Sequence, residues 1–233
     1  MLRILVTVAM CLALAAPAAA RSRTPNASAV TDAFFRTVFG LEYGVNHPDA
    51  YRVKRFNGPI SFYVADLSGQ NRRPAAHLFL RRLPREIAHL DARVVARAGE
   101  ANYRIFLVRQ SDFATVVADE LRADARAMNA RCLVGVTTDG GRITHATAVI
   151  VADDDYLFNR CLVEEVLQGL GPMNDSDALP DSVFNDTSRH AHFTSFDRAL
   201  LNVLYHPAIR PGMTGAQAQA ALPVALRDVG LNH

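Results

Sequence analysis

The stretch CLVEEVLQGLGPMND, residues 161–175, is an apolar run that contains three polar side chains, Glu164, Glu165 and Gln168, and ends in the polar pair Asn174 and Asp175. Residues four apart on a helix share a face, so Glu164 and Gln168 would lie together with Glu165 beside them. The surrounding leucines and valines predict that this helix is buried. A buried carboxylate is costly unless it is paired, hydrogen-bonded or protonated. The set therefore indicates a polar network, a metal site or a cleft with acid–base chemistry.

The spacing of this polar set matches a motif of zinc proteases. In HExxH enzymes two histidines at i and i+4 bind zinc, and the glutamate at i+1 is the general base. The metzincin branch extends the motif to HExxHxxGxxH, in which the glycine lets the chain turn toward a third ligand. In this sequence the five positions hold Glu164, Glu165, Gln168, Gly171 and Asn174. The general base and the turn glycine match, whereas all three metal ligands differ.

The chain resembles an uncharacterised family of exported bacterial proteins, described only as a domain of unknown function. The likeness rests on EExxQ-LG-ND followed by SVFND, TSFD and LYHPxIRPGM. It covers residues 30–223 and is specific over residues 161–213. The resemblance implies a zincin-like fold and no established activity. It also implies that the apolar strand before the helix is the zincin edge strand, and that Phe184 replaces the methionine of the Met-turn.

The residue types argue against zinc chemistry. Zinc prefers imidazole or thiolate, so Glu164, Gln168 and Asn174 would form a weak zinc site. Oxygen ligands suit Ca²⁺ or Mg²⁺, but such sites need more ligands than this motif offers. We therefore predict no metal and no cofactor, while a hard cation stays an alternative.

Two interpretations of the polar set remain open. In the first, the residues line a former active-site cleft that is non-catalytic and binds a protein, a peptide or a component of the cell envelope, or they only form a hydrogen-bonded network that fixes the loop to the helix. In the second, the chain is a metal-independent hydrolase with Glu165 as general base and Glu164 or Asp175 as its partner. The predicted cleft residues are Glu164, Gln168, Gly171, Asn174 and Asp175.

Hydrophobic periodicity places the central helix late in an α+β chain. The pattern predicts a mixed sheet with an antiparallel edge strand, packed on this helix and followed by a helical C-terminal part, in one domain over residues 30–233. Asp139-Gly140-Gly141 predicts a hairpin between the last two strands. Helices are expected at residues 30–40, 75–90, 112–129, 155–170 and 195–205 and after Thr214 with an interruption near Pro223, and strands within 51–66 and at 92–97, 102–109, 132–138 and 142–153.

The N-terminus has the pattern of a signal peptide. Arg3 precedes an apolar run at residues 4–16, and small residues fill positions 18–20. We expect cleavage after Ala20, a flexible segment at residues 21–29, no membrane span in the mature chain, and a periplasmic or secreted location. An oxidising compartment favours a disulfide between the two cysteines that remain, Cys132 and Cys161, over two buried thiols.

Composition excludes a strongly charged partner. The formal net charge is only +2, and the arginine pairs at residues 72–73 and 81–82 have no interleaved aromatic side chains. Nucleic-acid binding needs clustered basic residues with stacking partners, so we expect no nucleic-acid partner.

Overall fold

The computed structural model describes residues 25–41, 47–124 and 130–231. The predicted signal peptide, residues 1–20, lies outside this part of the chain, and so do residues 21–24. The remainder of the segment predicted to be flexible already contains the start of helix α1 (Ala27–Val38). Asn26 caps this helix, because its side-chain oxygen accepts a hydrogen bond from the Ala29 N–H at 2.7 Å.

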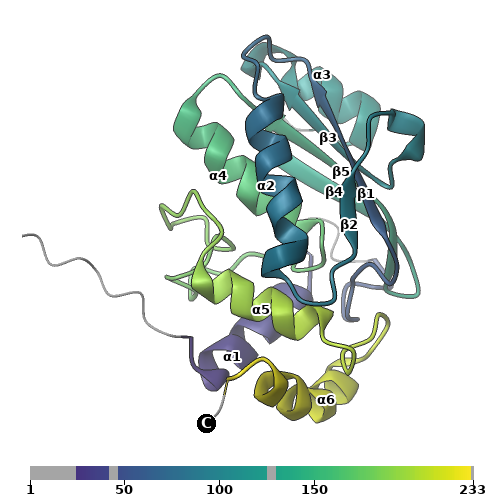
Figure 1. Ribbon diagram of the computed structural model, residues 1–233, viewed down its shortest axis with the longest axis vertical. Helices are drawn as coiled ribbons and strands as arrows, with labels where there is room; N and C mark the ends of the chain where they lie inside the picture. Colours follow the sequence, from purple (N-terminus) through teal and green to yellow (C-terminus); the bar gives the residue numbers. More distant parts are fainter. Residues whose placement is uncertain (1–24, 42–46, 125–129, 232–233) are drawn as a thin grey trace, which may run out of the picture.

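The centre of the fold is a five-stranded sheet in the order β2-β1-β3-β5-β4. Neighbouring strands are parallel except β4, which runs antiparallel to β5. The predicted mixed sheet with an antiparallel edge strand is therefore confirmed (Figure 1). The strands are β1 (Ile60–Asp66), β2 (Ala92–Val94), β3 (Tyr103–Val108), β4 (Cys132–Asp139) and β5 (Arg142–Val151).

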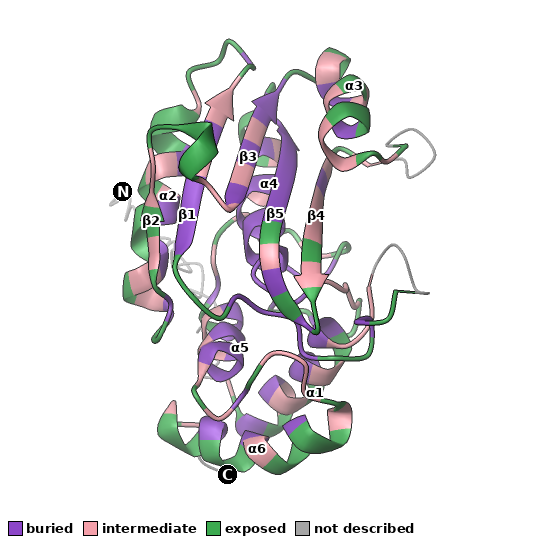
Figure 2. Cartoon of the chain, turned by 90° about the vertical axis from the view of Figure 1, so that its right-hand side faces the viewer, coloured by how far each residue is buried: buried purple, intermediate pink, exposed green. Residues whose placement is uncertain are grey.

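The resemblance placed the strand that precedes the central helix at the edge of the sheet, and this expectation is wrong. That strand is β5, which lies between β3 and β4, and it is buried along most of its length (Figure 2). A strand whose residues from Ala148 to Val151 are all buried needs neighbours on both sides. The predicted hairpin supplies the outer neighbour, because Gly140 and Gly141, both at positive φ, turn β4 back along β5.

Helices cover both faces of the sheet. Alternate residues of β5 face opposite sides, so Ala148 and Ile150 join the larger core with α2 and α4, whereas Val149 and Val151 pack with α3. These helices are α2 (Arg73–Glu86), α3 (Gln110–Leu121) and α4 (Asp155–Gln168). The central helix of the sequence motif is α4.

Three helices gather at one end of the sheet: α1, α5 (Ser195–Tyr205) and α6 (Gly215–Asp228) (Figure 1). The expected capping box of α5 is present, with Thr194 and Asp197 bonding to each other's backbone. The interruption expected near Pro223 is wrong, since α6 runs through it. Pro223 and Gln219 are both exposed, so water can satisfy the Gln219 carbonyl that proline leaves without a donor.

Several predicted elements end earlier than expected. The helix predicted at residues 112–129 ends at Leu121, where Arg122 adopts a left-handed conformation, and residues 125–129 lie outside the described residues. The strand predicted at 92–97 is limited to β2, and a short 3₁₀ turn, Ala98–Glu100, follows it. None of the helices in the described residues is long and apolar enough to span a membrane.

Candidate functional site

Covalent and polar contacts fix α4 against the sheet. The predicted disulfide is present, since Cys132 of β4 and Cys161 of α4 are joined with an S–S distance of 2.00 Å. The Tyr103 hydroxyl donates to the Glu165 carbonyl at 2.8 Å and to the Val166 carbonyl at 3.2 Å. Gly169 makes this approach possible, because a Cβ there would lie 2.0 Å from the Tyr103 oxygen.

Glu164, at the position of the first zinc ligand, pairs with an arginine one turn earlier. The Arg160 guanidinium lies 3.3 Å from the Glu164 carboxylate and 3.8 Å from that of Asp186. It also donates to the backbone carbonyls of Asn185 at 3.3 Å and Ser188 at 3.0 Å. Glu164 is only 5% exposed, so Arg160 supplies the opposite charge that a buried carboxylate requires.

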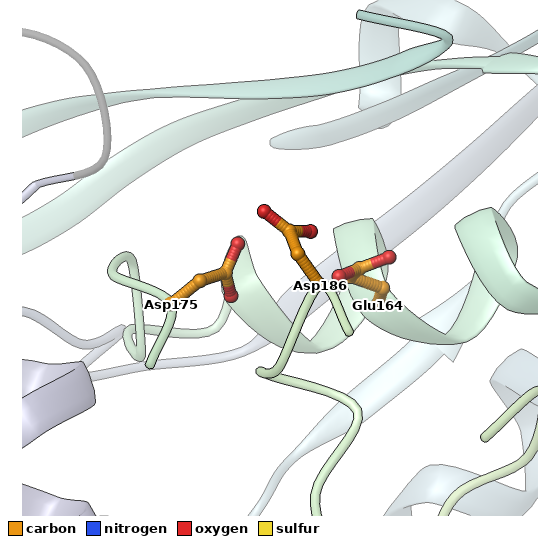
Figure 3. A group of neighbouring side chains, drawn as sticks. All are labelled: Glu164, Asp175 and Asp186. Carbon is orange, nitrogen blue, oxygen red and sulfur yellow. The ribbon is translucent and has the colours of Figure 1, made fainter. Parts of the chain in front are cut away.

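Gln168, at the position of the second zinc ligand, is also held by a protein group. Its side-chain amide donates to the Asp175 carboxylate at 2.8 Å. Carboxylate oxygens of Glu164, Asp175 and Asp186 lie within 4.8 Å of one another. Figure 3 shows the three side chains side by side, with Glu164 on the helix and the two aspartates on the segments that follow it. We call Arg160, Glu164, Gln168, Asp175 and Asp186 the α4 cluster.

Within the α4 cluster, Glu164, Asp175 and Asp186 are the one group of three or more potential His, Cys, Asp or Glu ligands in the part of the chain that the structure describes. Three carboxylates within this distance suit a hard cation such as Ca²⁺. The guanidinium of Arg160 already lies against two of them, at the distances given above. The positive charge that a cation would bring is thus partly provided by the protein.

Gly171 and Asn174 serve the geometry of the turn. Gly171 has φ +143°, and a Cβ there would lie 2.2 Å from the Lys54 carbonyl oxygen. Asn174, at the position of the third zinc ligand, is bound to α1: its backbone N–H donates to the Thr37 carbonyl at 3.1 Å and its amide to the Arg36 carbonyl at 2.9 Å. The residue brought to the cluster is its neighbour Asp175.

Glu165, the predicted general base, is 6% exposed. Its negative charge acts on the phenol of Tyr103, whose pKa is raised well above its ordinary value, first by complete burial and then by Glu165 and Tyr205. Tyr103 therefore stays protonated and keeps its role as a hydrogen-bond donor to α4.

The loop that carries Asp186 is pinned by a buried aspartate. Asp197, fully buried at the start of α5, accepts hydrogen bonds from the Ser182 hydroxyl at 2.6 Å and the Val183 N–H at 3.3 Å. Burial raises the pKa of Asp197, and its hydrogen bonds act in the opposite direction. Phe184, which the resemblance placed at the Met-turn, is fully buried in the main core.

Sequence reasoning missed two members of the α4 cluster, Arg160 and Asp186. The signal for Arg160 was available, because it precedes Glu164 by four residues, the spacing of a helical ion pair. No local signal marked Asp186, since its approach to α4 depends on how residues 176–190 fold back.

The model of one protein family, described as a protein of unknown function (DUF2927), matches residues 27–224. The chain belongs to the DUF2927 family. The match extends from the first residue of α1 into α6, so the sheet, the disulfide and the whole α4 cluster are parts of the DUF2927 domain. No curated protein matches the chain.

Proposed function

We propose that this DUF2927 protein is an exported, non-catalytic binding module with a zincin-like fold, whose metal site has been replaced by the α4 cluster. The fold supports the proposal through its antiparallel edge strand and through the helix that ends in a glycine turn. The disulfide and the lack of a membrane-spanning helix among the described residues fit an exported protein. The expected partner is a protein, a peptide or a component of the cell envelope.

The observation that carries the proposal is how the three zinc-ligand positions are occupied. Glu164 is paired with Arg160, Gln168 with Asp175, and Asn174 with the backbone of α1. A metal bound in the metzincin manner would have to replace these contacts. Hydrogen bonds to charged groups, such as those at Glu164 and Gln168, typically contribute about 1.5–3 kcal/mol each, and a neutral one, such as that of Asn174, about 0.5–1.5 kcal/mol, so their loss would oppose metal binding.

The burial of Glu165 supports the same interpretation. A general base must reach its substrate, directly or through one water molecule. The Glu165 side chain is almost completely buried. The backbone carbonyl of the same residue accepts a hydrogen bond from the Tyr103 hydroxyl. These contacts suit a residue that stabilises the helix in its place.

Metal analysis of the purified protein tests the proposal. We expect substoichiometric zinc, and no rise in melting temperature when zinc is added. A stoichiometric zinc ion that is lost in the Gln168→Ala variant would overturn the proposal. Gln219→Ala is the matched control, since Gln219 is exposed on α6 outside the α4 cluster.

A second candidate is the metal-independent hydrolase, which one observation favours. The carboxylates of Glu164, Asp175 and Asp186 lie within 4.8 Å of one another, so several groups capable of acid–base chemistry meet at one place beside Glu165 on the same helix. In this candidate Glu165 is the general base, with Glu164 or Asp175 as partner.

A hydrolase assay with Glu165→Gln separates the two candidates. The assay uses a mixed peptide library and ester substrates, with Glu120→Gln, a surface variant on α3, as control. If the protein is a binding module, we expect no turnover by the wild type, by Glu165→Gln or by Glu120→Gln. The hydrolase predicts turnover that Glu120→Gln keeps and Glu165→Gln loses, by about 100-fold or more.

A further inference from the structure

A second surface of the chain, on the far edge of the sheet from β4, is strongly basic. His77, Arg81 and Arg85 of α2 and Arg93 of β2 line an open groove of about 540 Å³. We call these four residues the basic edge. His77, Arg81 and Arg85 follow one another at intervals of four residues, so they form a stripe along one side of α2.

The arginines of the basic edge have no acidic partners in the part of the chain that the structure describes. Within the described residues, no carboxylate lies within ion-pair distance of Arg81, Arg85 or Arg93. Elsewhere on the surface such pairs are common, as in Arg36–Asp32 and Arg142–Asp139.

The local potential is positive enough to act on a histidine within the groove. Burial lowers the pKa of His77, and the nearby charges of Arg81 and Arg73 lower it further. Arg73 lies one turn before His77 and extends the stripe to the start of α2. The backbone N–H of Arg73 donates a hydrogen bond to the Asp66 carboxylate at 3.0 Å. An anion in the groove would relieve this repulsion.

Exposed apolar side chains lie on α2 and near its first turn. Leu78 of α2 is 62% exposed, Leu67 in the loop before α2 is 53% exposed, and Tyr156 at the start of α4 is 49% exposed. The starts of α2 and α4 are joined by the ion pair of Arg72 and Asp155 at 2.6 Å, so Tyr156 and Leu67 both lie near the first turn of α2.

The other flank of α2 borders a second groove of about 380 Å³, so α2 forms a ridge between two grooves. The lining of the second groove is mixed: Leu78, Phe79 and Phe193 lie beside Arg82, Glu86 and Arg198. Glu86 pairs with both of these arginines.

We propose that α2 and the basic edge dock on an anionic phospholipid surface. Arginines beside exposed leucine and tyrosine are typical of elements that lie in the membrane interface, where cations bind head groups and apolar side chains enter the acyl boundary. A single-stranded nucleic acid would favour Phe, Tyr or Trp side chains on which bases stack, and among the described residues none of these three types lines the basic groove. The proposal is independent of the function proposed above, because none of these residues belongs to the α4 cluster.

Vesicle binding tests the proposal. The exported protein is mixed with phosphatidylcholine vesicles with and without about one third phosphatidylglycerol, at low and high salt. We expect salt-sensitive binding that requires phosphatidylglycerol. The triple variant Arg81→Gln, Arg85→Gln, Arg93→Gln should bind on the order of 100-fold more weakly, since each arginine near an anionic surface contributes a factor of about five.

The matched control removes the same charge elsewhere. Arg131→Gln, Arg189→Gln, Arg210→Gln also replaces three exposed arginines, and we expect it to keep most of the binding. Every protein carries the same N-terminus, so any contribution of that segment cancels. Equal loss in both triple variants, equal binding to pure phosphatidylcholine, or binding to poly-glutamate but to no vesicle would overturn the proposal.

Tryptophan fluorescence supplies a second readout. The chain has no tryptophan, so Leu78→Trp introduces a single reporter on the ridge. Its emission should shift to shorter wavelength on phosphatidylglycerol vesicles, whereas Val224→Trp, at an exposed position of α6, should not shift. A shift at Val224→Trp alone would place the contact on another surface and contradict the proposal.

Discussion

The α4 cluster and the basic edge differ in whether their charged side chains are paired within the protein. In the α4 cluster, the buried Glu164 contacts the half-buried Arg160 at 3.3 Å. In the basic edge, Arg81, Arg85 and Arg93 are exposed and have no carboxylate partner among the described residues. A charge inside the protein must be matched by the chain itself, whereas an exposed charge is solvated and stays available to another molecule. We therefore expect the first region to stabilise the fold, and we propose the second for recognition.

The largest difference in stability is expected between two variants that each remove one arginine, one from the α4 cluster and one from the basic edge. Arg160→Met should lower the free energy of unfolding by about 3–4 kcal/mol, because it leaves the Glu164 carboxylate buried without its cation. Arg81→Met should change it by less than about 0.5 kcal/mol. Urea unfolding followed by circular dichroism measures both values. Similar losses in the two variants would break the comparison.

A smaller effect is expected at the glycine turn after α4. Gly171→Ala should destabilise the protein by about 2–3 kcal/mol more than Gly69→Ala. Both glycines have positive φ, but only at Gly171 would the new Cβ meet a backbone oxygen, that of Lys54, whereas Gly69 faces open space. Thermal unfolding of the two variants measures the cost of this close approach. Equal melting temperatures would show that the contact with the Lys54 oxygen does not destabilise the Gly171→Ala variant.

The smallest of the three effects concerns the buried cation Lys54, whose ammonium donates to the carbonyls of Val38, Ala50 and Arg52. Burial lowers the pKa of Lys54 from 10.5 to about 8. The unfolded chain therefore binds more protons than the folded chain between these two values, so stability should rise with pH in that window. We expect a rise of about 2 kcal/mol from about pH 8 to about pH 10.

Lys54→Met is the control for this pH dependence. It should be less stable than the wild type, because it loses the donors to these carbonyls, but it should lack the rise between pH 8 and 10. Equilibrium unfolding at several pH values measures the difference between the two proteins. The same rise in both would show that other groups cause it.

Features that depend on neighbouring residues could be predicted from the sequence. The capping box of α5, the hairpin at Gly140, the extent of α4 and the turn at Gly171 each follow from a few adjacent side chains. The disulfide followed from counting cysteines and from the expected export. These signals are local or arithmetic, and the structure bears them out.

Features that depend on distant segments could not be predicted in this way. The direction of Asn174 is decided by carbonyls of α1, far back in the sequence, and Asp186 reaches α4 only through the folded loop. The basic edge combines two short arginine groups, neither of which is notable alone, because α2 packs beside β2 and brings Arg93 to the stripe of Arg81 and Arg85.

The bond between Asn174 and α1 has a consequence for the order of folding. The Asn174 amide and its acceptor, the Arg36 carbonyl, are 138 residues apart. On the ribosome α1 is made early and must wait for most of the domain before it meets this partner. A domain with many contacts of such sequence separation folds slowly, because long loops must close before these contacts form. The segment after α4 can therefore reach its final position only when α1, the first helix of the chain, is in place beside it.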